Sequence, residues 1–140
     1  MMQGNGHIDG FRSLVAGVLL LGTGVVLGAF GAHGLDENLS PASRAAWQTA
    51  VQYQLVHGLA IFVLGAIADR LPAGQIRGHA AFLLGVGCVL FSGSIYWLTL
   101  GGPWWLGPVT PLGGVTMIMG WVWVLRWLWL ARAQATQPAG

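Results

Sequence analysis

A short segment near the middle of the chain carries the side chains with the most potential for chemistry. Tyr53, Gln54 and His57 follow closely in sequence, and at about 100° per residue on a helix they share one face with Ala50. Phenol, carboxamide and imidazole groups can bind a small molecule, carry a proton or hydrogen-bond to another helix. Gln48 and Gln52 point to a different face, so the polarity of this segment is divided between two directions.

The composition of the chain is that of a membrane protein. Of 140 residues, 55% are hydrophobic and only 7% are charged, whereas a soluble domain carries about 25% charged residues. The net charge of +2 comes from scattered arginines, and this pattern argues against nucleic acid as a partner. A single cysteine, Cys88, excludes an internal disulfide and a cysteine-based metal site.

Four apolar segments predict an all-α fold, namely an integral membrane four-helix bundle with short connections and a single domain over residues 1–140. The predicted spans are residues 13–32, 47–68, 79–100 and 109–131, followed by a polar tail over 132–140. Each span has about 20 residues or more, enough to cross about 30 Å of hydrocarbon. A span in lipid must satisfy its own backbone hydrogen bonds, which a helix does.

Two local signals refine these boundaries. Ser40 followed by Pro41 is a typical helix start, so the second helix is expected to begin near Pro41, ahead of its span. The run from Leu14 to Ala32 suits a membrane span better than the short core of a cleaved signal peptide, although the sequence AFGAH that ends nearby resembles a cleavage site.

The distribution of arginine predicts the orientation. With four spans, the N-terminus, the second connection and the C-terminus lie on one side of the membrane. That side holds five of the six arginines, namely Arg12, Arg70, Arg77, Arg126 and Arg132. The other side holds Arg44 alone. The positive-inside rule therefore predicts a multi-pass protein of the bacterial inner (plasma) membrane with both termini in the cytoplasm.

Small residues predict where the helices touch. Lipid removes the hydrophobic drive between helices, so close packing of small residues replaces it. The small residues expected at contacts are Gly17, Gly24, Gly28 and Gly31 on one stripe of the first span, and Ala81, Gly85, Cys88 and Ser92 on one arc of the third. Tyr96 continues the second group. The partner of the glycine stripe is either another helix of the same chain or a neighbouring copy.

The polar face of the second span lies deep in the predicted membrane. If lipid begins near Trp47, His57 lies about 15 Å deeper, where polar side chains face the bundle interior and form hydrogen bonds. Candidate partners on other spans are Thr23, Ser92, Ser94, Tyr96, Thr99, Thr110 and Thr116. His33 belongs with Gln48 and Gln52 in a separate polar group near the outer side.

Four interpretations of the polar face compete. The favoured one is an interhelical hydrogen-bond network that fixes helix packing. The second is a polar pocket for a lipid headgroup, a quinone or a small solute, and the third is a proton or ion pathway. The third has less support because all four acidic residues lie at span ends or in connections. The last is a haem or metal site, which His33 and His57 support weakly because they lack a metal-ligand spacing.

Four motifs in order resemble a known family. They are GAFGAHGL at 28–35, TAVQYQLVHGLAI at 49–61, FSGSIYWLTL at 91–100 and TPLGGVTMIMGW at 110–121. Together they are similar to the YgdD/YwdK-type bacterial membrane proteins, the family of domain of unknown function 423, which has small eukaryotic transmembrane relatives. The resemblance implies a small integral membrane protein and no established activity. The family-pattern positions are His33, Tyr53, Gln54, His57, Ser92, Ser94, Tyr96, Thr110, Pro111, Gly113 and Gly114.

The sequence contains no enzyme signature such as Gly-x-Ser-x-Gly or His-Glu-x-x-His. We therefore expect no catalytic residues, no metal and no cofactor. The expected function is a non-enzymatic packing or accessory component in contact with membrane lipids, either a homo-oligomer or a small subunit of a larger membrane complex. The alternative is a small-molecule, lipid or quinone binder or carrier. It requires a cavity of several hundred Å³ between the second and third spans, lined by Tyr53, Gln54, His57, Ser92 and Tyr96.

Overall fold

The computed structural model describes residues 4–35, 39–68, 70 and 74–135. It has four long helices, α1 (Gly4–His33), α2 (Pro41–Ala66), α3 (Gly74–Thr99) and α4 (Val109–Ala135), with a short 3₁₀ helix η1 (Trp104–Leu106) ahead of α4. All four long helices are long and apolar enough to cross a membrane, and none of the described residues lies in a strand. The predicted all-α membrane fold of four helices is confirmed.

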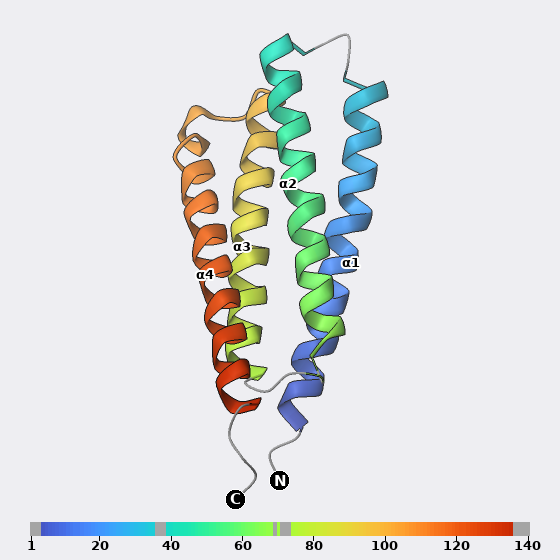
Figure 1. The fold of residues 1–140 in the computed structure, drawn as a ribbon. Coiled ribbons are helices and arrows are strands. Elements are labelled where there is room, and N and C mark those ends of the chain that lie inside the picture. The colour runs from blue at the N-terminus through green and yellow to red at the C-terminus, as the bar shows by residue number, and fades with distance from the viewer. Residues whose placement is uncertain (1–3, 36–38, 69, 71–73, 136–140) are drawn as a thin grey trace, which may run out of the picture.

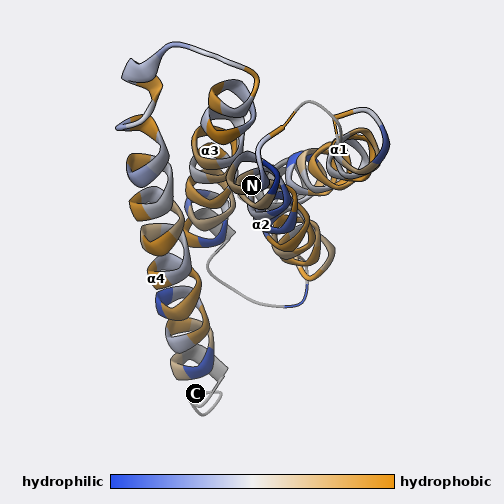
Figure 2. Ribbon diagram, turned by 90° about the horizontal axis from the view of Figure 1, so that it is seen from above, coloured by the Kyte–Doolittle hydropathy of each residue, from blue (hydrophilic) through white to orange (hydrophobic). Residues whose placement is uncertain are grey.

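The helices pack side by side in chain order, and the start of α1 and the end of α4 lie at the same end of the bundle, called here the end that carries the termini (Figure 1). α1 packs on α2, α2 on α3 and α3 on α4, while α1 also touches α3. Within the described segments α1 and α4 do not come into contact, and the view along the helices shows the open row that results (Figure 2). Accordingly, in the most apolar 18-residue stretch of each span, only 11% of the α1 stretch and 17% of the α4 stretch is buried. The corresponding shares for α2 and α3 are 39% and 33%.

The helix ends differ from the predicted spans mainly at the end that carries the termini. α1 begins at Gly4, α3 begins at Gly74, and α4 continues to Ala135, into the predicted polar tail. Residues 136–140 of that tail lie outside the described residues. α2 begins at Pro41 as expected, because the Ser40 hydroxyl accepts a hydrogen bond from the Ser43 N–H at 3.1 Å and caps the helix.

Glycines at seven-residue intervals seat α1 on α2. Gly10, Gly17, Gly24 and Gly31 recur at this interval, and a Cβ at each would meet α2 or the turn that follows it. At Gly17 that Cβ would lie 2.6 Å from the backbone nitrogen of Phe62, so only glycine fits there. A seven-residue repeat keeps one seam in contact between two helices that wind around each other. The partner of the predicted stripe is thus α2 of the same chain.

α3 presents two faces. Ala81 and Gly85 of the predicted arc face α2, since Ala81 packs in a cluster with Ile61 and Leu64 and Ile61 Cδ1 lies 3.6 Å from the place of a Gly85 Cβ. Cys88 of the same arc is buried. The face toward α4 depends on three glycines that the sequence analysis did not identify as contact residues, Gly87, Gly113 and Gly120, and their backbones lie against Met117, Phe91 and Leu84. The α3–α4 interface is therefore a close backbone contact, as packing in lipid requires, whereas at Gly85 α3 meets the side chain of Ile61 on α2.

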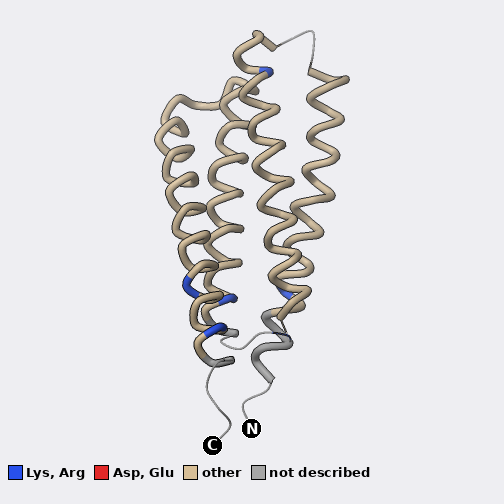
Figure 3. The backbone as a smooth tube through the Cα atoms, in the orientation of Figure 1, with Lys and Arg blue, Asp and Glu red and all other residues tan. Residues whose placement is uncertain are grey.

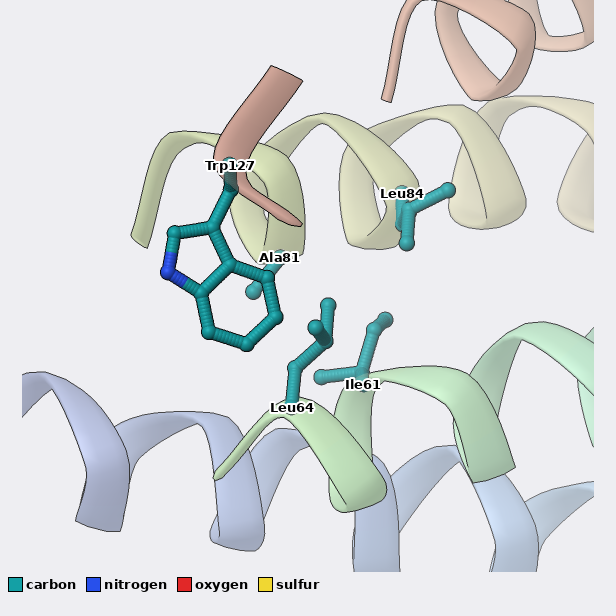
Figure 4. Close-up of a cluster of buried hydrophobic side chains, with 5 residues drawn as sticks. All are labelled: Ile61, Leu64, Ala81, Leu84 and Trp127. Carbon is teal, nitrogen blue, oxygen red and sulfur yellow. The ribbon is translucent and has the colours of Figure 1, made fainter. Parts of the chain in front are cut away.

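A core cluster joins three helices toward the end that carries the termini. Ile61 and Leu64 from α2, Ala81 and Leu84 from α3 and Trp127 from α4 meet there (Figure 4). Their side chains are nearly inaccessible to solvent or lipid. The cluster holds α4 to the α2–α3 pair near that end of the bundle.

Most of the arginines gather at that same end (Figure 3). One of them corrects the sequence analysis, which placed Arg77 in the connection before the third span. Arg77 lies in α3 and is 1% exposed, and its Nη1 donates a hydrogen bond to the Leu64 carbonyl at 3.3 Å. A carbonyl near a helix C-terminus lacks an intrahelical donor, and a cationic side chain can supply one.

Candidate functional site

Gln54 is the centre of the buried polar groups. Its Nε2 donates to Thr23 Oγ1 at 2.8 Å and to the Leu20 carbonyl at 3.0 Å, both on α1. Its Oε1 accepts from the Tyr96 hydroxyl of α3 at 2.9 Å. The side chain is only 5% exposed, yet both amide hydrogens and the oxygen have partners. One carboxamide from α2 therefore ties three helices together.

His57 is held in one neutral form by its two neighbours. Its Nδ1 lies 2.8 Å from the Tyr53 carbonyl, and its Nε2 lies 3.2 Å from the indole nitrogen of Trp121. A carbonyl only accepts and an indole N–H only donates, so the proton belongs on Nδ1 and Nε2 is the acceptor. Both ring nitrogens are thus engaged, and neither is available as a ligand while these bonds persist.

Tyr53 departs from its predicted inward position. Its side chain is 41% exposed, and its ring lies against Phe91 at 4.7 Å and stacks on His57 at 5.8 Å between centroids. Its hydroxyl has no hydrogen-bond partner within the described parts of the chain. The reason is the open row, since α2 has only α1 and α3 as described backbone neighbours, and α3 covers Tyr53 only in part, through Phe91.

Two serines of α3 complete the interhelical bonds. Ser92 Oγ donates to the Ala50 carbonyl of α2 at 2.8 Å, and Ser94 Oγ lies 2.7 Å from Thr110 Oγ1 of α4. Two other candidate partners, Thr99 and Thr116, bond to carbonyls of their own helices instead. We call the side chains that bond between helices in this region the polar network, namely Thr23, Gln54, His57, Ser92, Ser94, Tyr96, Thr110 and Trp121.

Two tryptophans that act through their N–H groups were missed by sequence reasoning. Trp121 binds His57, and Trp47 donates to the Leu27 carbonyl of α1 at 2.9 Å while only 3% exposed. The sequence analysis used Trp47 as a marker of the lipid boundary. A signal existed, because Trp47 lies on the same helical face as Gln54 and His57.

The predicted outer-side group lies apart from the polar network. His33, Gln48 and Gln52 are all exposed. The two glutamines line a depression of about 340 Å³ between α1 and α2. We call it the glutamine notch and define it by Gly28, Gly31, Ala32, Arg44, Gln48 and Gln52. Neither glutamine side chain hydrogen-bonds to another described residue, and His33 does not line the notch.

Direct hydrogen bonds occupy the place where a pocket between the second and third spans was considered. Three cavities of the described chain have volumes of about 750, 460 and 340 Å³. None of these three is lined by Gln54, His57 or Tyr96. In the described part of the chain, no group of three or more His, Cys, Asp or Glu residues is placed to hold a metal ion.

Known proteins resemble this chain over most of its length. The family model described as "Protein of unknown function (DUF423)" matches residues 27–114. The UPF0382 membrane protein YwdK of Bacillus subtilis (strain 168) is 43% identical over 88 residues, which cover 63% of this chain and 72% of the relative. The UPF0382 membrane protein SH2409 of Staphylococcus haemolyticus (strain JCSC1435) is 39% identical over 99 residues, covering 71% and 80%. No solved structure matches.

Proposed function

Since the chain belongs to the DUF423 family, as its motifs predicted, and that family has no assigned activity, we propose a function from the surface of the molecule. The protein is a non-enzymatic accessory component of the bacterial plasma membrane. It acts by binding other membrane helices through the glutamine notch, either in copies of itself or in a larger complex.

The observation that carries this proposal is the depth of Gln52. α2 has 26 residues and measures about 39 Å, about 9 Å more than the hydrocarbon core. Gln52 follows the start of the helix at Pro41 by about 16 Å. If all the excess length lay at this end, Gln52 would still lie about 7 Å inside the hydrocarbon.

An unpaired carboxamide at that depth is costly, because lipid tails offer it no hydrogen bond. Gln48 and Gln52 lie one turn apart, and the notch that they line together with the small, exposed Ala32 is open at the surface, so another helix can approach it closely. Glutamine bonds between membrane helices are worth roughly 0.6–2 kcal/mol each. Two such bonds over a small-residue surface favour association.

The buried polar groups support a non-enzymatic role. The side chains with the most potential for chemistry, Gln54, His57 and Tyr96, are held by one another or by neighbouring helices. For the same reason the alternative of a small-molecule or quinone carrier with a site between α2 and α3 has less support. Its pocket would require these hydrogen bonds to break.

Native mass measurement after extraction in a gentle detergent tests the proposal. We expect particles whose mass is a multiple of 14.8 kDa for self-association, or one chain plus a different subunit for a larger complex. The double variant Gln48→Leu/Gln52→Leu should shift the population toward the monomer. Thr49→Val is the matched control, because Thr49 is exposed on the same helix but bonds to the Ala45 carbonyl. A monomeric wild type, or a double variant that assembles normally, would contradict the proposal.

A further inference from the structure

A groove lies between α1 and α3, with Ile61 of α2 at its floor. Its volume is about 750 Å³, within the range of roughly 300–1,000 Å³ that is typical of ligand sites. Small residues open it, namely Ala16 on α1 and Ala81 and Gly85 on α3, while Leu20, Ile61 and Leu90 supply apolar walls. We call it the α1–α3 groove and define it by these six residues together with three polar residues, Arg12, Ser13 and His79.

One end of the groove is polar and cationic. Arg12 and Ser13 from α1 and His79 from α3 line it there, at the end of the bundle that carries both termini. Arg12 and His79 are exposed, so a group at the membrane surface can reach them. A guanidinium group binds phosphate through two parallel hydrogen bonds.

The length of the groove matches one leaflet of a bilayer. Along α3 its lining runs from Gly78 to Leu90, about 18 Å at 1.5 Å per residue. This is slightly more than half of a hydrocarbon core of about 30 Å. A transmembrane helix of a partner would need a groove through both leaflets, whereas an acyl chain reaches only to the middle.

We propose that the α1–α3 groove is a binding site for an anionic phospholipid of the leaflet at the terminus-bearing side. One acyl chain lies along Ala16, Ile61 and Gly85. The phosphate lies against Arg12, beside Ser13 and His79, which line the same end of the groove. The charge of Arg12 complements the phosphate, and basic pockets between membrane helices on the cytoplasmic side are known to bind anionic headgroups.

This proposal is independent of the association proposed for the glutamine notch. The notch lies between α1 and α2 near the opposite end of the helices, and the two sites share none of their lining residues. An oligomer and a bound lipid are therefore separate outcomes.

Native mass spectrometry of the full chain in detergent, with equal amounts of phosphatidylglycerol and phosphatidylcholine, tests the proposal. We expect one retained phosphatidylglycerol per chain. Arg12→Gln should reduce its preference over phosphatidylcholine by about five-fold, and Arg12 is exposed, so this variant should fold. Arg126→Gln, which removes a charge at the same end but outside the groove, should leave the preference unchanged. Equal retention of both lipids by the wild type would overturn the proposal, as would equal losses in the two variants.

A second pair of variants tests the acyl-chain part. Gly85→Leu places a side chain in the groove, and an added Cβ there meets only Ile61 Cδ1 at 3.6 Å, so the helix contact tolerates it. We expect the retained lipid to be lost. Gly22→Leu adds the same side chain on α1 where a Cβ meets nothing within 4 Å, and should retain the lipid. Retention by Gly85→Leu equal to that of Gly22→Leu would overturn the proposal.

Discussion

The indole N–H of Trp121 donates to Nε2 of His57 at 3.2 Å, and so links α4 to α2, two helices whose described backbones do not otherwise approach each other. Gln54 similarly links α2 to α1 and α3, and Ser94 links α3 to α4. These bonds are directional, so each one fixes the rotation and the height of one helix against the next. Glycine packing without such bonds would restrict the sliding of one helix along its neighbour less strongly.

Trp121→Phe removes the donor to His57 and leaves Nε2 without a partner. We expect a loss of about 0.6–2 kcal/mol in the free energy of unfolding, measured in mixed micelles. Trp129→Phe is the control, because Trp129 is 74% exposed. Trp121→Phe should lower the free energy of unfolding less when it is introduced into the His57→Phe variant than when it is introduced into the wild type. Identical costs in the two backgrounds would show that the bond does not contribute.

The two tyrosines of the chain allow a matched comparison. Tyr96→Phe removes the hydroxyl that donates to Gln54 Oε1, and should cost about 1 kcal/mol in the free energy of unfolding. Tyr53→Phe removes a hydroxyl with no described partner, and should change the free energy of unfolding by only a few tenths of the change expected for Tyr96→Phe. Thermal unfolding in detergent compares the two variants directly. An equal loss in both would mean that the hydrogen bond from Tyr96 to Gln54 does not contribute to stability.

The helical wheel identified the polar face correctly for Gln54 and His57, but not for Tyr53. A wheel assumes that the inward side of a helix is covered by neighbours over a wide arc. In an open row the covered arc of α2 is narrower, so Gln54 is 5% exposed and Tyr53, one residue earlier, is 41% exposed. The helix that lies opposite each residue depends on the order in which the four helices pack. A single sequence does not reveal that order.

The glycine stripe of α1 was predictable, whereas the α3–α4 contact was only partly so. Gly113 and Gly120 are seven residues apart, the same interval as on α1, and this repeat is a signal that the sequence contains. Gly87 has no glycine seven residues before or after it, since Ala80 and Ser94 stand there. Its role follows only from the close approach of Met117.

Gly17→Ala should be strongly destabilising, because its Cβ would lie 2.6 Å from the backbone nitrogen of Phe62 and a backbone cannot move aside cheaply. We expect a loss of about 1–3 kcal/mol in the free energy of unfolding. Gly22→Ala, where a Cβ has open space, should be neutral or more stable, since alanine favours helix. Equal stability of the two variants would contradict the α1–α2 seam.

Arg77→Gln should be destabilising although the position reads as part of a turn. The sequence DRLPAGQIRG contains proline and glycines that are typical of a connection, but Arg77 lies in α3 and is buried against the end of α2. Losing the bond to the Leu64 carbonyl should cost about 1–3 kcal/mol. The control is Arg70→Gln, because Arg70 is exposed. Chemical denaturation of the two variants in micelles measures the difference, and a neutral Arg77→Gln would contradict this role.

The burial of Arg77 leaves four arginines, Arg12, Arg70, Arg126 and Arg132, at the end of the bundle that carries the termini, against Arg44 at the other end. This bias still predicts that the termini are cytoplasmic.

Cysteine labelling tests this orientation. Cys88 is the only cysteine and is fully buried, so it should not react with an impermeant maleimide. Any labelling then comes from a cysteine that has been introduced. Ala42→Cys, at the exposed start of α2, should be labelled in intact spheroplasts. Ala133→Cys should be labelled only after permeabilisation, and the reverse pattern would show that the arginine bias does not set the orientation.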